Sequence, residues 1–201
     1  MPCKNSLTKT PQARSLAESG KYNKKSHADP LMNDLSLKTT AEAPRTIAES
    51  QVVMTELVLP NDTNQLGNLL GGRLMHWMDI AAALAAMRHS RRVCVTASVD
   101  GMSFHAPIKL GNVVILKASV NRVFNTSMEV GVRVEMENPL TGTLIHANTA
   151  YLTFVGIDES GKPLPAAPII PETDAERRRY DAAGIRRAGR LENRKRIEAL
   201  L

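Results

Sequence analysis

The feature that most restricts the fold of this chain is a helical segment with apolar side chains on nearly all of its sides. The double glycine Gly71-Gly72 opens the segment, which we expect to run to about His89. Apolar residues all round a helix indicate that other elements bury it on most faces. The rest of the chain therefore has to enclose this one helix.

Strand patterns stand before and after the helix, and short turns join them. The residues from 128 to 137 alternate between apolar and charged side chains, which is typical of a half-buried strand. Short connections favour antiparallel neighbours, so we predict the α+β class, with a curved antiparallel sheet wrapped around one long helix. Exposed edge strands would favour pairing with a second copy. The expected strands cover residues 51–59, 93–104, 113–124, 128–137 and 143–156.

The net charge of +6 resides at the two ends of the chain. Residues 1–50 and 171–201 each carry an excess of three positive charges, whereas residues 51–170 carry as many acidic as basic side chains. A neutral body, in a chain with only seven aromatic residues, argues against a nucleic-acid interface. We therefore expect no nucleic-acid partner.

A membrane span, a secretory signal and a disulfide framework are not expected either. His76 and Asp79 interrupt the best candidate for a membrane span, and the N-terminus lacks the apolar stretch that secretory signals contain. The two cysteines fall in a polar tail (Cys3) and in an apolar strand pattern (Cys94). This cysteine usage predicts a cytoplasmic protein with reduced thiols.

Composition divides the chain into three parts. Residues 1–50 are polar with scattered proline and serine, which predicts a mobile N-terminal extension. Residues 51–160 form the predicted domain, and residues 161–201 form a Pro-rich link followed by a basic helix from about Thr173. The arginines of that helix have two interpretations of equal weight. They form ion pairs with interspersed acids on a solvated helix, or they bind the phosphates of a nucleotide-bearing ligand.

Asp79 is the first candidate for chemistry, because a carboxylate among apolar helix residues is costly unless it is paired. Such a carboxylate could act as a general base on water or attack directly as a nucleophile. The alternative is a core aspartate that backbone N–H groups of a strand hold in place. Asp79 alone does not decide between these interpretations.

The helix start favours the catalytic interpretation. Backbone N–H groups at a helix N-terminus are unpaired and carry positive partial charge. Because Gly71 and Gly72 have no side chains, an oxygen that gains charge in a reaction, such as a thioester carbonyl, could approach these groups. The alternative is that the two glycines only allow a tight turn or close packing.

Asn68 is the third candidate, since its amide could orient a water molecule or hold a carbonyl group. The alternative is an ordinary loop or N-cap asparagine. Eleven residues separate Asn68 from Asp79, and most of them are helical at ~1.5 Å rise per residue, so the two lie more than ~10 Å apart in one chain. They could meet across a two-fold axis, which predicts an obligate dimer with two equivalent sites. No spacing of histidines, cysteines and acids predicts a metal site.

Four segments together resemble the hotdog-fold acyl-CoA thioesterases, in particular the cytosolic acyl-CoA hydrolases and their bacterial single-domain counterparts. The resemblance covers about residues 52–180 and implies hydrolysis of acyl-CoA to a free carboxylic acid and CoA, without a metal or a cofactor. The segments are Gly67-Asn68-Leu69-Leu70-Gly71-Gly72, Met78-Asp79, Thr96-Ala97-Ser98-Val99-Asp100 and Asn125-Thr126-Ser127-Met128-Glu129.

The resemblance also implies roles for individual residues. Asp79 matches the catalytic aspartate, Asn68 its paired asparagine, and Gly71 and Gly72 the helix start that polarises the thioester carbonyl. The pantetheine arm of CoA would follow the strand that contains Thr96 and Ser98. The CoA phosphates would lie near the turn and near basic residues of the C-terminal segment; the turn residues are Arg122, Thr126 and Ser127.

The resemblance further implies an assembly. Because this chain contains a single hotdog domain, the paired unit must be a homodimer, and a trimer of dimers is the expected hexamer. Two other functions stay open. One is an acyl-thioester dehydratase on the same fold, although such enzymes place a histidine opposite the acid and no histidine here stands in a matching motif. The other is a non-catalytic CoA-ester-binding regulator, although residues 1–50 contain no helix-turn-helix pattern.

Overall fold

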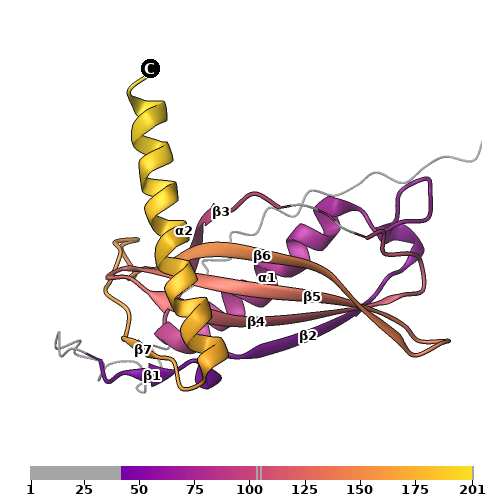
Figure 1. Ribbon diagram of the computed structural model, residues 1–201, viewed down its shortest axis with the longest axis horizontal. Helices are drawn as coiled ribbons and strands as arrows, with labels where there is room; N and C mark the ends of the chain where they lie inside the picture. The colour runs from indigo at the N-terminus through magenta and orange to yellow at the C-terminus, as the bar shows by residue number, and fades with distance from the viewer. Residues whose placement is uncertain (1–41, 103, 105, 201) are drawn as a thin grey trace, which may run out of the picture. The chain divides into compact units, whose positions relative to one another are not determined.

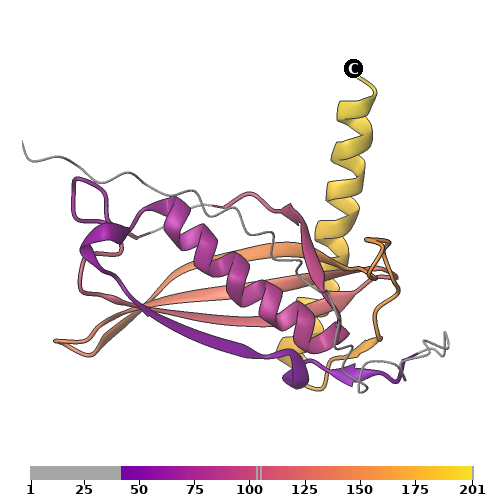
Figure 2. The same ribbon diagram turned by 180° about the vertical axis from the view of Figure 1, so that it is seen from behind.

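The computed structural model describes residues 42–102, 104 and 106–200. Their central element is an antiparallel sheet with helix α1 against one face and helix α2 against the other (Figures 1 and 2). In chain order the elements are β1 (Arg45–Thr46), η2 (Ala48–Ser50), β2 (Val52–Leu57), η3 (Pro60–Asp62), α1 (Gly71–Ser90), β3 (Cys94–Val99), β4 (Val113–Val123), β5 (Ser127–Asn138), β6 (Thr143–Gly156), β7 (Ile169–Ile170) and α2 (Asp174–Glu198).

The five long strands lie in the order β2-β4-β5-β6-β3, and every neighbouring pair is antiparallel. Strand β3 therefore follows α1 in the chain but joins the far edge of the sheet, beside β6. Both edge strands, β2 and β3, have one side without a partner strand in the described part of the chain. The predicted α+β architecture, a curled antiparallel sheet with one long helix against it, is confirmed.

Helix α1 packs on the sheet with one side only, which corrects the expectation that it is buried on most faces. Small and apolar side chains on its inner side meet the alternating apolar residues of β4, β5 and β6. On its other side Met75, Ile80 and Leu84 are 46%, 37% and 40% exposed. The five-stranded sheet covers one side of the helix, and no other described element covers the outer side. The buried residues of α1 are Leu74, Trp77, Met78, Ala81, Ala82, Ala85, Ala86, His89 and Ser90.

Helix α2 begins with a capping box. The Thr173 side chain accepts a hydrogen bond from the Glu176 backbone N–H, and the Glu176 carboxylate accepts from the Thr173 N–H at 2.9 Å. These bonds lower the pKa of Glu176, because the charged carboxylate accepts backbone donors. No helix among residues 42–102, 104 and 106–200 is long and apolar enough to cross a membrane.

The outer face of the sheet binds α2 through a buried carboxylate. Glu129 of β5 is fully buried and accepts from Arg186 Nη2 at 2.6 Å, from Arg190 Nη2 at 3.2 Å and from Asn121 Nδ2 at 3.2 Å. Arg190 also binds Asp100, at 2.7 Å. Neither interpretation of the tail arginines anticipated this, because the acids that hold Arg186 and Arg190 belong to the sheet and not to the helix itself.

Ordered elements begin before the predicted boundary at residue 51. Strand β1 pairs in parallel with β7, and Ile47 beside it is fully buried. Two-residue strands carry no periodic pattern, so the sequence did not predict them. The predicted mobile extension otherwise falls on residues 1–41, which lie outside the described residues.

The C-terminal end of α1 carries a buried histidine, and we expect it to make stability depend on pH. His89 has no exposed surface, and its Nε2 lies 2.8 Å from the carbonyl oxygen of Ala167. Burial lowers the pKa of His89 below its ordinary value of 6.5. As the pH falls below about 6.5, the unfolded chain binds a proton that the folded chain resists, so the free energy of unfolding falls until the lower pKa is reached.

Urea unfolding at a series of pH values between neutrality and pH 5 would measure this dependence. A His89→Gln variant should show a flatter pH profile than the unmodified chain. The matched control is His76→Gln, at an exposed position of the same helix, which should leave the profile as it is. An unchanged profile in His89→Gln would contradict the assignment.

Candidate active site

The start of α1 is open on one side and tightly packed on the other. Leu70 at the N-cap provides no side-chain cap for the first N–H groups. A Cβ atom added to Gly72 would meet nothing within 4 Å, whereas one added to Gly71 would stand 3.3 Å from the ring of Phe104. Gly72 thus leaves the helix start accessible, and Gly71 allows the Phe104 ring to approach it. Both interpretations of the double glycine therefore have a basis in the structure.

A buried aspartate fixes the loop that leads into this helix. The Oδ1 atom of Asp62 lies 2.7 Å from Arg73 Nε in the first turn of α1. Its Oδ2 atom accepts from the Leu59 N–H at 3.1 Å, and its backbone carbonyl accepts from the Leu70 N–H at 2.9 Å. These bonds hold the helix start against η3, so the exposed N–H groups have a fixed position.

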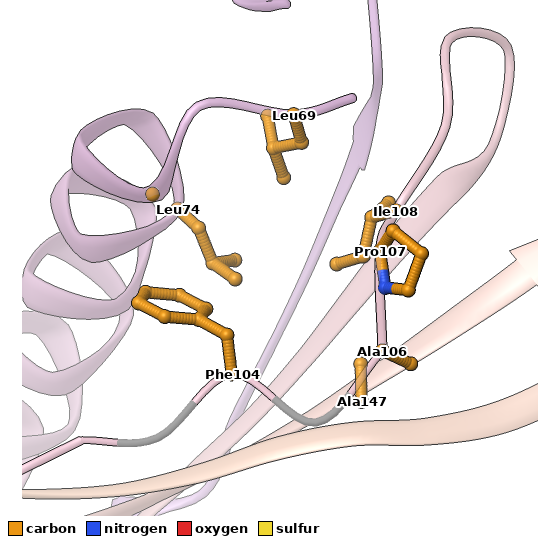
Figure 3. Close-up of a pocket in the computed structure, with 8 residues that line it drawn as sticks. Leu69, Leu74, Phe104, Ala106, Pro107, Ile108 and Ala147 are labelled. Carbon is orange, nitrogen blue, oxygen red and sulfur yellow. The ribbon is translucent and has the colours of Figure 1, made fainter. Parts of the chain in front are cut away.

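An apolar cavity of about 320 Å³ lies beside this helix start (Figure 3). Leu74 and Phe104 stand on one side of it, and Ile108 and Pro107 on the other. Apolar side chains dominate its wall, which suits a hydrocarbon group. The lining residues are Leu69, Gly71, Leu74, Phe104, Ala106, Pro107, Ile108 and Ala147.

Asp79 lies on the outer side of α1, next to edge strand β3. Its carboxylate is half-buried, and its Oδ1 atom accepts a hydrogen bond of 2.7 Å from the hydroxyl of Thr96. The flanking Met75 and Ile80 are exposed as well, which does not fit the alternative of a core aspartate. The structure also brings Thr96, predicted to contact CoA, into direct contact with Asp79.

Asn68 lies in a tight loop together with Asn64. The Asn64 Oδ1 atom accepts from the backbone N–H groups of Leu66, at 2.9 Å, and of Asn68, at 3.2 Å. The Asn64 N–H in turn donates to the Asn68 carbonyl at 2.8 Å. Among the residues that the structure describes, no hydrogen bond joins either asparagine to Asp79. Of these two asparagines, the sequence analysis had predicted a role only for Asn68.

A large groove of about 880 Å³ runs between β3 and α2, and it brings Ser98 and Ser127 together. Three arginines, Arg187, Arg190 and Arg194, line the same groove. The Ser127 hydroxyl already accepts from Arg187 Nη1 at 2.9 Å. Arg190 is bound to Asp100 and Glu129, so the groove combines hydroxyl groups with the positive charges of Arg187 and Arg194, groups that can bind a phosphate.

Arg122 is engaged elsewhere. Its guanidinium lies 4.3 Å from the centre of the Tyr180 ring, and its Nη1 atom donates to the Tyr180 carbonyl at 3.4 Å. Thr126 is half-buried in the turn that precedes β5. In residues 42–102, 104 and 106–200, no group of three or more histidine, cysteine or acidic side chains could hold a metal ion.

Comparison with known proteins places the chain in a family. Residues 66–143 match the model of the thioesterase superfamily. The Bacillus subtilis protein described as an uncharacterized acyl-CoA thioester hydrolase, YkhA, is 43% identical over 157 residues, which is 77% of this chain and 91% of that protein. The chain belongs to the acyl-CoA thioester hydrolase family. The resemblance found in the sequence is thereby confirmed.

Solved structures of acyl-CoA hydrolases share the fold. That of the Staphylococcus aureus hydrolase, determined with butyryl-CoA, CoA and CoA disulfide, is 36% identical with a TM-score of 0.70, and covers 78% of this chain and 99% of its own. A hexameric acyl-CoA thioesterase without ligand is 40% identical with a TM-score of 0.71, and covers 79% and 99%. Variants of the S. aureus hydrolase replace single residues by alanine: an aspartate, an asparagine 15 positions before it and a threonine 17 positions after it.

Proposed function

We propose that this chain is an acyl-CoA thioesterase that hydrolyses acyl-CoA to a free carboxylic acid and CoA. The observation that carries the proposal is the hydrogen bond of 2.7 Å between Thr96 and Asp79, about two turns from the open start of the same helix. Thr96 follows Asp79 by 17 positions, the separation of the threonine and aspartate replaced in the S. aureus hydrolase. Hydrolysis adds water across the C–S bond, and the proposal includes no metal or cofactor.

The same spacing points to a different asparagine from the one predicted. The residue 15 positions before Asp79 is Asn64, again the residue type replaced in the S. aureus hydrolase. Asn68 is only 11 positions before Asp79. Both asparagines belong to one loop, so assigning the role of the paired asparagine to Asn64 leaves that role in the same loop. We therefore favour Asn64 over Asn68 as the amide that orients water or substrate.

A complete site requires two chains. Asp79 follows Gly72 by seven residues, so the carboxylate and the open helix start are separated by roughly 10 Å along one helix at ~1.5 Å rise per residue. A single thioester cannot contact both groups at reacting distance, which is about 3 Å. In the proposed site, Asp79 of one chain acts as general base or nucleophile. In the other chain, the helix start at Gly71-Gly72 polarises the carbonyl, and the loop of residues 64–68, called the asparagine loop below, orients the reactants.

Exposed apolar surface supports this pairing. Val93, Val95 and Val99, on and beside edge strand β3, are 65%, 43% and 50% exposed. Strand β3 packs against α1 and holds Thr96 against Asp79. A homodimer formed through β3 would cover these side chains and bring two sites together. A trimer of such dimers, in the cytoplasm, remains part of the proposal.

The acyl group and the CoA moiety would occupy different spaces. The apolar cavity beside Gly71 suits the acyl chain. The groove with Ser98, Ser127, Arg187 and Arg194 suits the pantetheine arm and the phosphates of CoA. Arg187 and Arg194 replace Arg122 in this assignment, since Tyr180 holds the Arg122 guanidinium and the carboxylates of Asp100 and Glu129 hold that of Arg190.

Release of free thiol from a panel of acyl-CoAs, followed with purified dimeric protein, tests the proposed function. Multiple turnovers with at least one chain length are expected. Tight binding of CoA esters without thiol release would instead indicate a non-catalytic regulator. Hydration of an enoyl-CoA without thiol release would indicate a dehydratase.

Substitutions in the asparagine loop should separate the two candidates. We expect Asn64→Ala to lower kcat by about 10²–10³-fold, because an oriented donor to the reacting groups is lost. Asn68→Ala should have the smaller effect. Asn64→Asp is the control for loop structure, since it keeps the oxygen that accepts from Leu66 and Asn68 but loses the amide donors. A larger loss in Asn68→Ala than in Asn64→Ala would overturn this assignment.

A further inference from the structure

Strand β6 contains a bulge beside the apolar cavity. Val134 of β5 pairs with Asn148, but Glu135 pairs with His146, so Ala147 is an extra residue in β6. A bulge interrupts the alternation of side chains between the two faces of a sheet. Ala147 is 3% exposed and lines the cavity. Of the eight lining residues, it alone belongs to a strand of the five-stranded sheet.

The sheet therefore presents only a methyl group to the cavity. Ala147 lies across the cavity from Leu69 and Leu74, which flank the start of α1 (Figure 3). Protein interiors contain few voids, and a cavity against a buried side chain loses contacts that a larger side chain would make. A cavity of about 320 Å³ is open here although a valine or a leucine would fill part of it. The small size of Ala147 keeps the cavity open at the sheet.

We infer that Ala147 sets the length of the longest acyl chain that the enzyme accommodates. The inference rests on the proposed function, which assigns the thioester carbonyl to the helix start at Gly71-Gly72 and the acyl chain to this cavity. A chain that crosses the cavity from the helix start meets Ala147 of β6, a strand inside the sheet and not at its edge. Each methylene that enters the cavity leaves water, which strengthens binding by about fourfold. A methylene beyond Ala147 finds no further space.

A series of saturated acyl-CoAs of increasing chain length tests the inference through kcat/KM for thiol release. In the unmodified enzyme, kcat/KM should rise by about fourfold with each methylene until the chain reaches Ala147, and should then stop rising. Ala147→Val should lower this limit by about two carbons and Ala147→Leu by about three, as many carbon atoms as each substitution adds. Because the limit is measured from ratios between chain lengths, a uniform loss of activity does not shift it.

Melting temperatures separate this role from a role in core packing. If Ala147 borders open space, the larger side chains fill that space, and the melting temperature of Ala147→Leu equals or exceeds that of the unmodified chain. If Ala147 only packs in the core, a leucine overpacks it. The melting temperature then falls while the chain-length limit stays the same, and this result overturns the inference.

Two further variants serve as controls. Ala188→Leu adds the same atoms at an exposed position of α2, outside the residues that line the cavity and the groove, and should leave the limit as it is. Leu69→Ala removes from the opposite wall as many carbon atoms as Ala147→Leu adds, so the double variant should regain the original limit.

The outcomes distinguish the inference from the proposed function. The same limit in the unmodified enzyme and in Ala147→Leu overturns the inference, as does a kcat/KM that does not depend on chain length. Absence of thiol release from every acyl-CoA in the series would refute the proposed function instead.

Discussion

Alanine in place of Asp79 should lower kcat/KM for acyl-CoA hydrolysis by about 10²–10⁴-fold. The carboxylate is the acidic group that the structure places beside edge strand β3 with a fixed orientation, through the hydroxyl of Thr96 at 2.7 Å. Since Asp79 is half-buried and stands on the outer side of α1, its loss removes no core packing. The effect should therefore appear in turnover and not in folding or assembly.

Two matched variants sharpen this prediction. Asp79→Asn keeps the shape and the bond to Thr96 but removes the basic oxygen, so it should be nearly as inactive as Asp79→Ala. Thr96→Val keeps the carboxylate but removes the hydroxyl that orients it, so a smaller loss of about tenfold is expected. Steady-state kinetics with size-exclusion chromatography would measure both. Near-normal turnover in a dimeric Asp79→Ala protein would contradict the proposed mechanism.

Mixed dimers test whether two chains share each site. Asp79→Ala and Asn64→Ala proteins, each nearly inactive alone, would be unfolded together and refolded. If Asp79 of one chain works with Asn64 of the other, a mixed dimer has one site with both substitutions and one intact site. Random pairing should then restore about a quarter of the unmodified activity. No recovery would place both residues of a site in the same chain.

Local patterns in the sequence were sufficient to predict the helices and long strands, but not to predict which elements pack against one another. The alternation of residues 128–137 and the glycine-opened apolar segment correspond to β5 and α1. The position of β3 at the far edge, beside β6, depends on pairing across more than fifty residues, which no local pattern encodes. The burial of α1 on most of its faces was a wrong prediction for the same reason: an apolar residue pattern does not tell which side of a helix the sheet covers.

In the candidate site, too, some residues could be predicted from the local sequence and others could not. Asp79 and the double glycine stand out because a carboxylate and two glycines are unusual in an apolar helix. Asn64 does not stand out, since a loop asparagine is common and only the spacing in a relative distinguishes it from Asn68. Glu129 looked like one of several charged residues on the outer face of a strand. Its burial depends on α2, whose Arg186 lies 57 residues further along the chain.

Replacing Arg186 by alanine should lower the free energy of unfolding by about 3 kcal/mol. The Glu129 carboxylate is fully buried, so it depends on the charge of α2 for compensation. Arg186 binds it through both Nε, at 3.2 Å, and Nη2, at 2.6 Å, and its guanidinium also lies 3.6 Å from the centre of the Tyr151 ring. Without Arg186, only Arg190 and Asn121 remain to hold the carboxylate, and the buried charge is left partly uncompensated.

Urea unfolding of the Arg186→Ala protein, monitored by circular dichroism, would measure this loss. The matched control is Arg178→Ala, at an exposed position of the same helix, which should change stability by less than about 0.5 kcal/mol. Glu129→Gln combined with Arg186→Met should recover part of the loss, because neither a buried charge nor its missing partner then remains. If Arg186→Ala and Arg178→Ala unfold at the same urea concentration, the bond to Glu129 does not anchor α2. The stability of the groove that α2 forms with β3 must then come from its apolar contacts.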